Sequence, residues 1–368
     1  MELFFDLVYV FAITQLSEFL GRHLSSRGAL QALVLFGAVW WAWNYTAWAT
    51  NWIDPDRWRV ALLMIVLMGI SLVMSASIPE AFGSRGMAFA VSYVAIQVLR
   101  SGFIVVALRG QAMGRNYAQL LAWSAISGAV WIAGALAHGD ARLWLWIAAL
   151  VLDLGAPLHG FRLPGVPGTP LEAWTLAGGH LAERCQLVLL IALGESVLRV
   201  GATFGAEHGR AAVDTAFVVG FVTTVSLWAI YFLHHAEVGA RSMAVATGAA
   251  ARMGRSGYAY AHAIMVAGVI VVAVGIRLTI GHPEGASSTA VAATVLGGPA
   301  IYLAGDALFK HSVTTERTLP PVLGICVLAL LSPLALAIDR LSLAIAAMVV
   351  VVVLAIAAGR REPAGAES

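Results

Sequence analysis

The sequence predicts an all-α membrane protein, a polytopic bundle of about twelve transmembrane helices. Hydrophobic residues make up 60% of the 368 residues and charged residues only 11%, which is far more apolar than a typical soluble domain. Apolar runs recur along the whole chain, and each is near the roughly 20 residues that a helix needs to cross about 30 Å of hydrocarbon. The runs are rich in Leu and Ala and lack the alternation of membrane barrel strands, so we expect helices.

The expected spans follow one another with short connections. The first six lie near residues 3–20, 29–52, 60–80, 87–108, 116–138 and 141–158, and the next six near 178–199, 212–236, 256–280, 287–309, 319–338 and 341–358. Polar residues interrupt the first run, and no basic region precedes it. These features are atypical of a cleavable signal peptide, so we expect the first run to stay as a spanning helix.

A proline-rich segment separates two groups of six spans. Pro164, Pro167 and Pro170 exclude a continuous helix there. We therefore expect a first membrane half over 1–160 and a second over 171–368, with a short C-terminal tail. The segment "DLVYVFAITQL" resembles "QLVLLIALGES" weakly, which indicates either a repeat of the two halves or a chance match between apolar stretches.

Basic residues set the expected orientation. The loops that share a side with both termini carry the larger number of Lys and Arg, which predicts cytoplasmic termini in a bacterial inner membrane. This bias also accounts for the net charge of +2. No basic segment is interleaved with stacking aromatics, so nucleic acid is not an expected partner. The expected partners are the lipid bilayer and a small solute or protons, and the sequence leaves the oligomeric state open.

The opening stretch "MELFFDLVYVFAITQLSEFL" carries an acidic residue inside an apolar run. At 100° per residue, Glu2, Asp6, Ile13 and Ser17 share one arc of a helix. Carboxylates in membrane helices are costly and usually face a bundle interior or a water-filled cavity. Asp6 is therefore a candidate functional residue, and the alternative is a carboxylate near the interface that pairs with a loop arginine.

The seventh expected span, "HLAERCQLVLLIALGESVL", carries four more candidates: His180, Glu183, Arg184 and Glu195. On a helical wheel these residues share an arc of about 120°. Arg184 has His180 and Glu183 within one turn. Glu195 lies roughly 16 Å further along the helix. A charged Glu195 needs a partner from another helix, and the candidates are Arg100 and Arg277; an isolated Glu195 would stay protonated, as a proton-coupling carboxyl requires.

Other polar groups can be interpreted either as structural or as functional residues. The run "WWAWNYTAWATNW" predicts tryptophans at the membrane interface, or else a stacked ligand pocket. His234, His235 and Glu237, with His262 nearby, suit a metal by residue type but lack a defined ligand spacing, so interfacial histidines are expected and no metal or cofactor. Asp306 and Lys310 are one turn apart and able to pair. Cys185 and Cys326 are expected to be small core residues.

Two blocks carry a resemblance to a known family. "ELFFDLVYVFAITQLS" and "HLAERCQLVLLIALGES", about 180 residues apart, resemble the bacterial low temperature requirement protein A (LtrA) family. The resemblance implies a multi-pass bacterial membrane protein linked by name to growth in the cold. It brings no substrate and no catalytic residue with it.

The leading functional hypothesis is a proton-coupled secondary transporter or permease whose halves enclose a polar path. The alternative is a membrane-embedded enzyme or accessory protein that acts on a lipid-like substrate, with His180 and Glu183 as acid–base groups. A third is a purely structural membrane protein. The sequence shows no nucleotide-binding loop, nucleophile elbow or zinc-protease motif, and enzymatic activity stays undecided. We also expect the first and seventh helices to be neighbours.

Overall fold

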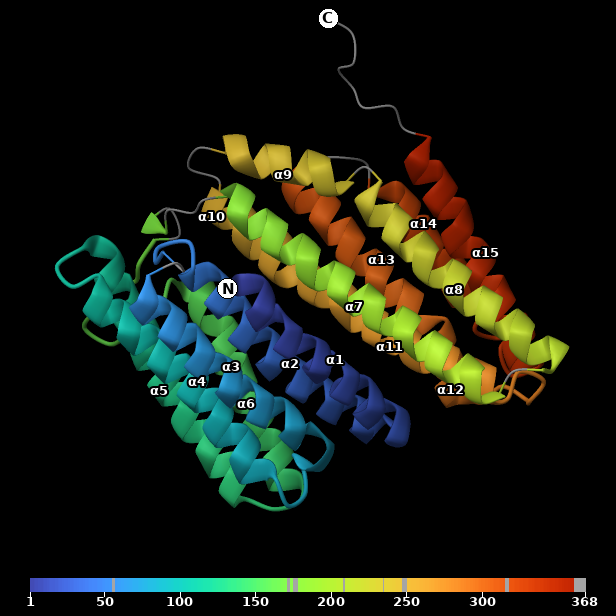
Figure 1. Cartoon of the computed structure of the whole chain (residues 1–368), viewed down its shortest axis with the longest axis horizontal. Helices are drawn as coiled ribbons and strands as arrows, with labels where there is room; N and C mark the ends of the chain where they lie inside the picture. Colours follow the sequence, from blue (N-terminus) through green and yellow to red (C-terminus); the bar gives the residue numbers. More distant parts are fainter. Residues whose placement is uncertain are drawn as a thin grey trace, which may run out of the picture. The chain divides into compact units, whose positions relative to one another are not determined.

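The computed structural model describes the chain except for residues 55–56, 171–172, 175–177, 208, 234, 247–249, 315–317 and 361–368, and it does not describe the side chains of 199–200 and 202–207. The described residues form helices joined by turns (Figure 1). Two isolated β-bridges, Leu163 with Val166 and Ala286 with Asp339, are the extended pairings among them. The all-helical prediction is confirmed for these residues.

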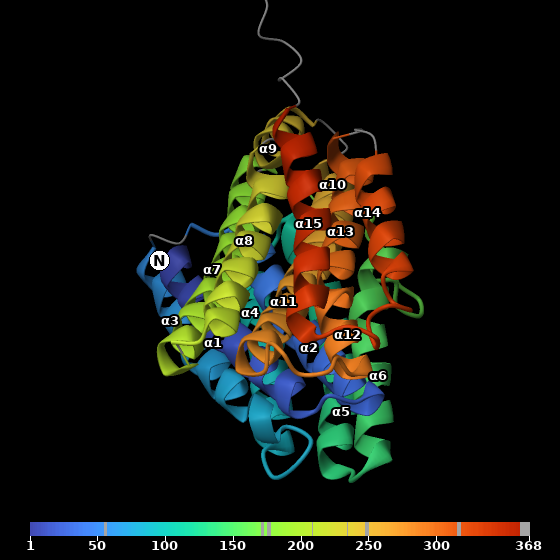
Figure 2. The ribbon, with the colours of Figure 1, turned by 90° about the vertical axis from the view of Figure 1, so that its right-hand side faces the viewer.

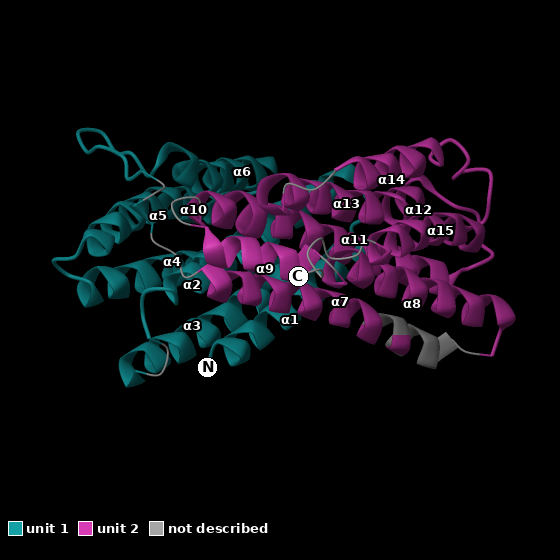
Figure 3. Cartoon of the chain, turned by 90° about the horizontal axis from the view of Figure 1, so that it is seen from above, with its two compact units in different colours: residues 1–176 teal, residues 177–368 magenta. Residues whose placement is uncertain are grey.

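Backbone contacts divide the chain into two compact units (Figure 3). Unit 1 covers Met1–Leu176 and unit 2 covers Ala177–Ser368. Unit 1 holds α1 (Glu2–Arg22), α2 (Ser26–Ala49), α3 (Trp58–Ser77), η1 (Ile78–Glu80), α4 (Gly86–Ala107), α5 (Ala112–Leu136), α6 (Asp140–Gly155) and η2 (Ala156–His159).

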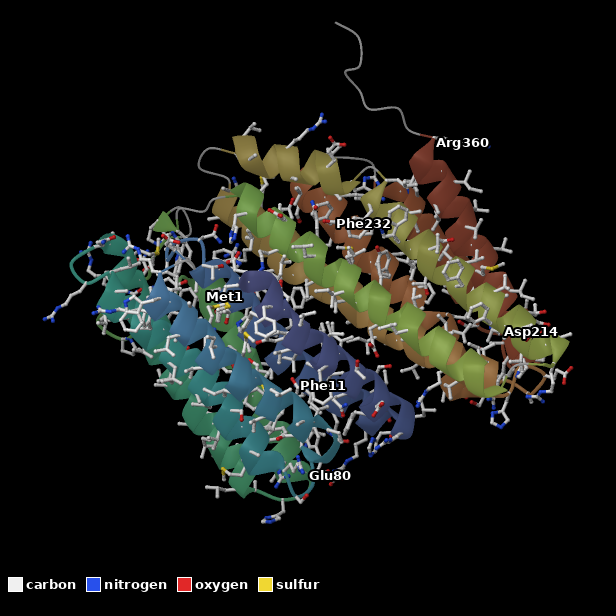
Figure 4. The ribbon with its side chains drawn as sticks, viewed as in Figure 1. Met1, Phe11, Glu80, Asp214, Phe232 and Arg360 are labelled. Atoms are coloured by element: carbon white, nitrogen blue, oxygen red, sulfur yellow. The ribbon has the colours of Figure 1, made fainter. Side chains whose placement is uncertain are left out.

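The helices of unit 1 run back and forth, so that consecutive connections lie at opposite ends. Met1 and Glu80 mark these two ends in Figure 4. Helix α2 is the inner element, because it packs against α1, α4 and α6. Its second half is almost wholly buried, including Trp40, Trp41, Trp43 and Trp48. These four pack inside the unit, whereas Trp58 is 70% exposed, and their expected depth at the membrane interface stays a prediction.

Unit 2 begins with α7 (Gly178–Glu207), which continues well beyond its expected end. It is followed by α8 (Ala211–Phe232), α9 (His235–Val245), α10 (Ala250–Met253), η4 (Gly254–Ala261), α11 (His262–Gly281), α12 (Thr289–Val295), α13 (Gly297–Phe309), η5 (Lys310–Thr314), α14 (Leu319–Leu330) and α15 (Arg340–Gly359). Helix α9 contacts α7, α8 and η5 and crosses one end of the unit (Figure 1). Figure 2 shows α8, α13 and α15 along the length of the same unit.

Nine segments of the described chain are long and apolar enough to cross a membrane as helices. They are Glu2–Arg22, Trp58–Glu80, Gly86–Ala107, Ala112–Leu136, Asp140–His159, Ala211–Val245, Ala250–Gly281, Thr289–Thr314 and Arg340–Gly359. The chain is a multi-pass integral membrane protein. The expected spans at 29–52, 178–199 and 319–338 correspond to α2, α7 and α14, which are not among the nine. The count of about twelve therefore stays a prediction.

Two of the expected spans have different bounds for local reasons. The span at 319–338 is helical only to Leu330 and continues in turns, because Pro333 lacks a backbone N–H and disfavours helix before it. The span at 287–309 is divided at Leu296 into α12 and α13. Gly297, Gly298 and Pro299 follow that division, and Pro299 cannot donate the next helical hydrogen bond.

Candidate functional site

A buried carboxylate on α6 is the centre of a polar network in unit 1. The Tyr93 hydroxyl donates to Asp153 Oδ2 at 2.7 Å, and the Trp131 indole donates to the same oxygen at 2.9 Å. The Trp41 indole donates to the backbone carbonyl of Asp153 at 3.1 Å. Three helices besides α6 therefore hold this residue.

The network extends along α4 to a buried cation. Gln97 Nε2 donates to the Tyr93 hydroxyl at 2.9 Å, and Arg100 Nη2 donates to Gln97 Oε1. These residues lie at i, i+4 and i+7, so one face of α4 carries all three. Arg100 is fully buried, and its guanidinium carbon lies 5.2 Å from the centre of the Tyr45 ring. A neutral tyrosine and a neutral amide thus link a carboxylate to a guanidinium.

The physical consequence is that an acidic and a basic side chain are held apart inside apolar surroundings. Neutral donors hydrogen-bond the Asp153 carboxylate, and a cation–π contact with Tyr45 stabilises the Arg100 guanidinium. Buried charges are tolerated where hydrogen bonds and an opposite charge compensate the lost hydration. Arg100 was expected only as a partner for Glu195. Its described contacts are with Gln97, Ser101 and Tyr45 inside unit 1.

Asp6 is buried in unit 1, on the face that the helical wheel indicates. The indole of Trp43 donates to Asp6 Oδ1 at 2.8 Å. Asp6, Ile13 and Ser17 are all buried, and Glu2 is half-buried. The tryptophan-rich stretch of α2 therefore supplies indole N–H donors to two acidic residues. One indole donates to the side-chain carboxylate of Asp6, and another donates to the backbone carbonyl of Asp153.

A second pair of charges is buried in unit 2. Lys310 Nζ lies 2.5 Å from Asp306 Oδ2, and the two side chains are 4% and 0% exposed. The pair spans one turn where α13 continues into the π-helix η5. The pairing expected from the sequence is confirmed. Single π-helical turns are frequent at functional sites, which makes this junction a candidate position.

The buried pair borders a small cavity that a histidine also lines. His235, Asp306 and Lys310 lie in the wall of a cavity of about 20 Å³, which has room for about one water molecule. The rest of the wall is apolar and consists of Ile230, Leu303, Pro320, Pro321 and the end of α15. His235 begins α9 and is fully buried. An acid, a base and a cation from three elements therefore meet at one end of unit 2.

The histidines expected as metal candidates do not gather in the described structure. His262 Nδ1 donates to the Gly257 carbonyl at 2.9 Å, so the neutral ring accepts from the Tyr231 hydroxyl, 2.9 Å from Nε2. Glu237 forms an exposed ion pair with Arg241. His234 lies outside the described residues. Among those that are described, no group of three or more His, Cys, Asp or Glu side chains could hold a metal ion.

The candidates on α7 differ in exposure. Arg184 and Glu195 are buried, at 2% and 7% exposure, while His180 is half-buried and Glu183 is exposed. A Cβ atom added at Gly194 would meet no atom within 4 Å, so there is open space beside Glu195. Arg277 is half-buried on α11 in the same unit. The pairing of Glu195 and the adjacency of the first and seventh helices stay predictions.

Sequence reasoning missed Tyr93, Gln97 and Trp131 and did not connect His235 with Asp306. Tyr93 and Asp153 are 60 positions apart, and no local spacing links them. The sequence does contain one signal for this network, because the spacing of Tyr93, Gln97 and Arg100 places all three on one helical face. The expectation that Cys326 is a core residue is wrong, because Cys326 is exposed on α14. Cys185 is buried, as expected, and its thiol faces the Tyr258 carbonyl at 3.5 Å.

The family resemblance of the two sequence blocks that contain Asp6 and Glu195 is confirmed by comparison with known proteins. The family model described as bacterial low temperature requirement A protein (LtrA) matches residues 1–356. A protein of Rhizobium meliloti (strain 1021), named uncharacterized protein RA0937, is 36% identical over 321 residues, which cover 87% of this chain and 78% of the relative. No solved structure matches the chain. The chain therefore belongs to the bacterial low temperature requirement A protein family.

Proposed function

We propose that this protein is a proton-coupled secondary transporter of the bacterial inner membrane. The observation that carries the proposal is the buried Asp306–Lys310 pair, which borders a water-sized cavity together with His235. Ionisable side chains inside membrane segments are rare and usually mark a solute path or a proton relay. The pair lies within the membrane-spanning segment Thr289–Thr314.

Stability alone does not explain such a pair. Taking two charges out of water costs several kcal/mol per ion, and apolar replacements of buried pairs are often neutral or stabilising. A proton on Asp306 removes the counter-charge of the Lys310 ammonium, so the protonated state favours a new negative partner at Lys310. Proton binding and solute binding would then be linked through one pair. Glu195 on α7 is the second candidate for the coupling carboxyl.

The test is reconstitution of the purified protein in liposomes with a pH-sensitive dye inside and a panel of solutes outside. We expect solute-driven proton movement with the wild type and its loss with Asp306→Asn/Lys310→Met. This double variant removes both charges together and so avoids an unpaired buried lysine. Asp214→Asn is the matched control, because Asp214 is exposed at the start of α8 (Figure 4). Proton coupling that survives in the double variant would reject the role of the pair.

A parallel measurement addresses Glu195. Glu195→Gln keeps the shape of the side chain and removes its titration. A coupling role predicts normal insertion and purification with lost proton movement. A structural ion pair predicts lowered stability instead, by about 3–5 kcal/mol, because a buried arginine would lose its partner. Normal activity with lowered stability would reject the coupling role of Glu195.

A further inference from the structure

A groove at one end of unit 1 combines apolar walls with basic side chains. Its volume is about 600 Å³, and it is lined by Trp123 of α5, by Val151, Leu152 and Gly155 of α6, and by Ala156, His159, Arg162, Leu163, Pro164 and Gly165 of the segment that follows. This volume lies within the range of small-molecule sites in proteins. The ten lining residues include no Asp or Glu.

The polar and apolar parts of the groove are separated along α6. Val151 is 61% exposed in a membrane-spanning segment, so the α6 wall is open to the hydrocarbon. Arg162 and His159 are exposed beyond the end of α6, where the chain leaves the membrane. The Trp123 indole N–H is buried and has no hydrogen-bond partner among the described residues. An amphipathic ligand with a charged end matches this arrangement.

The wall formed by residues 162–165 is held in place by hydrogen bonds to α5 and within the segment. Gln119 Nε2 donates to the Pro167 carbonyl at 2.9 Å, and the Thr169 hydroxyl donates to Gln119 Oε1 at 2.6 Å. The backbone N–H of Thr169 donates to the Gly160 carbonyl at 2.7 Å. The groove is therefore built before any ligand arrives, which lowers the ordering cost of binding.

Charge selects the occupant. Arg109 and Arg115 are located at the same end of unit 1 as Arg162, because they follow α4 and begin α5. Juxtamembrane basic residues attract anionic lipids by about 1 kcal/mol each. A second groove, at the opposite end of the unit, is lined by Glu18 and Glu80 as well as Arg22 and His23. That mixed lining does not select an anion.

We propose that the groove between α5, α6 and the 159–165 segment binds an anionic phospholipid, with its headgroup at Arg162 and His159 and an acyl chain along Val151 and Leu152. The site belongs to unit 1 and shares no residue with the Asp306–Lys310 pair of unit 2. It does not depend on the proposed transport activity. The Trp123 indole donates toward an oxygen of the headgroup or glycerol ester.

The test uses the full chain in an uncharged detergent, with phosphatidylglycerol or phosphatidylcholine of the same acyl chains added. The thermal unfolding midpoint and the number of bound lipids in native mass spectra are measured. We expect phosphatidylglycerol to bind and to raise the midpoint more than phosphatidylcholine does. Arg162→Gln should weaken this binding about fivefold, the equivalent of one surface charge contact. Arg85→Gln, a matched change of an exposed arginine at the opposite end of unit 1, should leave it unchanged.

A second variant tests the apolar part of the groove. A Cβ atom at Gly155 meets no atom within 4 Å, so Gly155→Leu is expected to fold and to occupy the groove with its side chain. This variant should lose the selective lipid effect while its midpoint without lipid stays at or above that of the wild type. Equal effects of the two lipids on the wild type would overturn the proposal, as would equal losses in Arg162→Gln and Arg85→Gln. A change of oligomeric mass in Gly155→Leu, with lipid binding intact, would assign the groove to a second copy of the chain instead.

Discussion

At the residue scale, Tyr93 is the connecting group of the unit 1 network. Its hydroxyl donates to Asp153 and accepts from Gln97, so one oxygen satisfies a carboxylate and an amide. Removal of this hydroxyl leaves the buried Gln97 Nε2 without its acceptor, while Asp153 Oδ2 loses one donor and keeps the Trp131 indole. The ring itself packs against Trp131, with centroids 4.9 Å apart, and would keep that contact as phenylalanine.

We therefore expect Tyr93→Phe to destabilise the protein by about 1–3 kcal/mol, the cost of one buried donor left unsatisfied. Thermal unfolding in detergent measures the effect. Tyr117→Phe is the matched control, because Tyr117 is equally buried in unit 1 and its hydroxyl makes no hydrogen bond with the described residues. A midpoint that falls equally in both variants would show that tyrosine burial alone, and not the network, matters.

The Asp306–Lys310 pair gives a second prediction at this scale, about stability. Asp306→Asn alone leaves the buried ammonium of Lys310 without its counter-charge and should cost about 3–5 kcal/mol. Asp306→Asn/Lys310→Met should recover most of that loss, because no buried charge remains. Unfolding midpoints of the single and double variants, with Asp214→Asn as control, check this. A double variant less stable than Asp306→Asn would contradict it.

At the element scale, the contact of α11 with α13 depends on glycine. A Cβ atom at Gly268 would lie 2.5 Å from the backbone nitrogen of Tyr302, and one at Gly298 would lie 2.7 Å from that of Val272. Small residues allow membrane helices to approach closely, where packing and polar contacts hold them together. The Tyr302 hydroxyl then reaches the Leu227 carbonyl of α8 at 2.8 Å, which ties a third helix to the pair.

Gly268→Ala should therefore destabilise the protein by about 1–3 kcal/mol, the range found for overpacked cores. The neighbouring atoms belong to the backbone, so no side-chain rotation relieves the clash. Gly281→Ala on the same helix is the control, since an added Cβ there meets nothing within 4 Å. The two variants are compared by thermal unfolding. Equal stability of both variants would contradict the prediction, because it would mean that the close approach of α11 and α13 does not stabilise the protein.

The start of α15 is fixed by a capping aspartate outside the membrane segment. Asp339 Oδ1 accepts from the backbone N–H of Ser342 at 2.9 Å, and Oδ2 accepts from its hydroxyl at 2.7 Å. These hydrogen bonds lower the pKa of Asp339 below its ordinary value. A lowered folded-state pKa means that the cap stabilises the protein above the unfolded pKa of about 3.9. The contribution is lost as the pH falls through the folded value.

Asp339→Ala should thus lower stability by about 1 kcal/mol at neutral pH, the typical loss of an N-cap, and by less below pH 4. Unfolding midpoints of the variant and the wild type, measured from pH 7 down to pH 3, test the convergence. Asp54→Ala, a change of an acidic residue in a loop, provides the comparison. A difference that stays constant with pH would exclude the carboxylate as the stabilising group.

At the scale of the whole molecule, sequence periodicity predicted which elements exist and less of what they contact. Hydropathy located the helices because lipid requires every backbone polar group to be paired within its segment. The buried face of α1, with Asp6, Ile13 and Ser17, also followed from the helical period. Long-range partners did not follow, since Asp153 meets Tyr93 and Trp131 only through tertiary packing. The partners of the Trp41 and Trp43 indoles, which donate to buried acceptors on α6 and α1, did not follow either.

The number of membrane crossings decides on which sides the termini lie. Nine crossings, the number of long apolar helices in the described residues, place the two termini on opposite sides. Twelve crossings, with α2, α7 and α14 included, place both on one side. We expect twelve, because each unit then contains an even number of crossings and the basic loops share the side of the termini, which the inside-positive bias assigns to the cytoplasm. Helix α14 has only twelve residues, so the turns after Leu330 would complete its passage.

Reporter fusions at the N-terminus, at Gly209 between α7 and α8, and after Ser368 measure this arrangement in cells. An even count with cytoplasmic termini predicts active cytoplasmic reporters at both ends and a periplasmic reporter at Gly209, since seven crossings precede that position. Cytoplasmic signals from one end only would give an odd count. A cytoplasmic signal at Gly209, with both ends cytoplasmic, would mean that α2 or another helix before α8 does not cross the membrane, and the two six-helix halves would have to be abandoned.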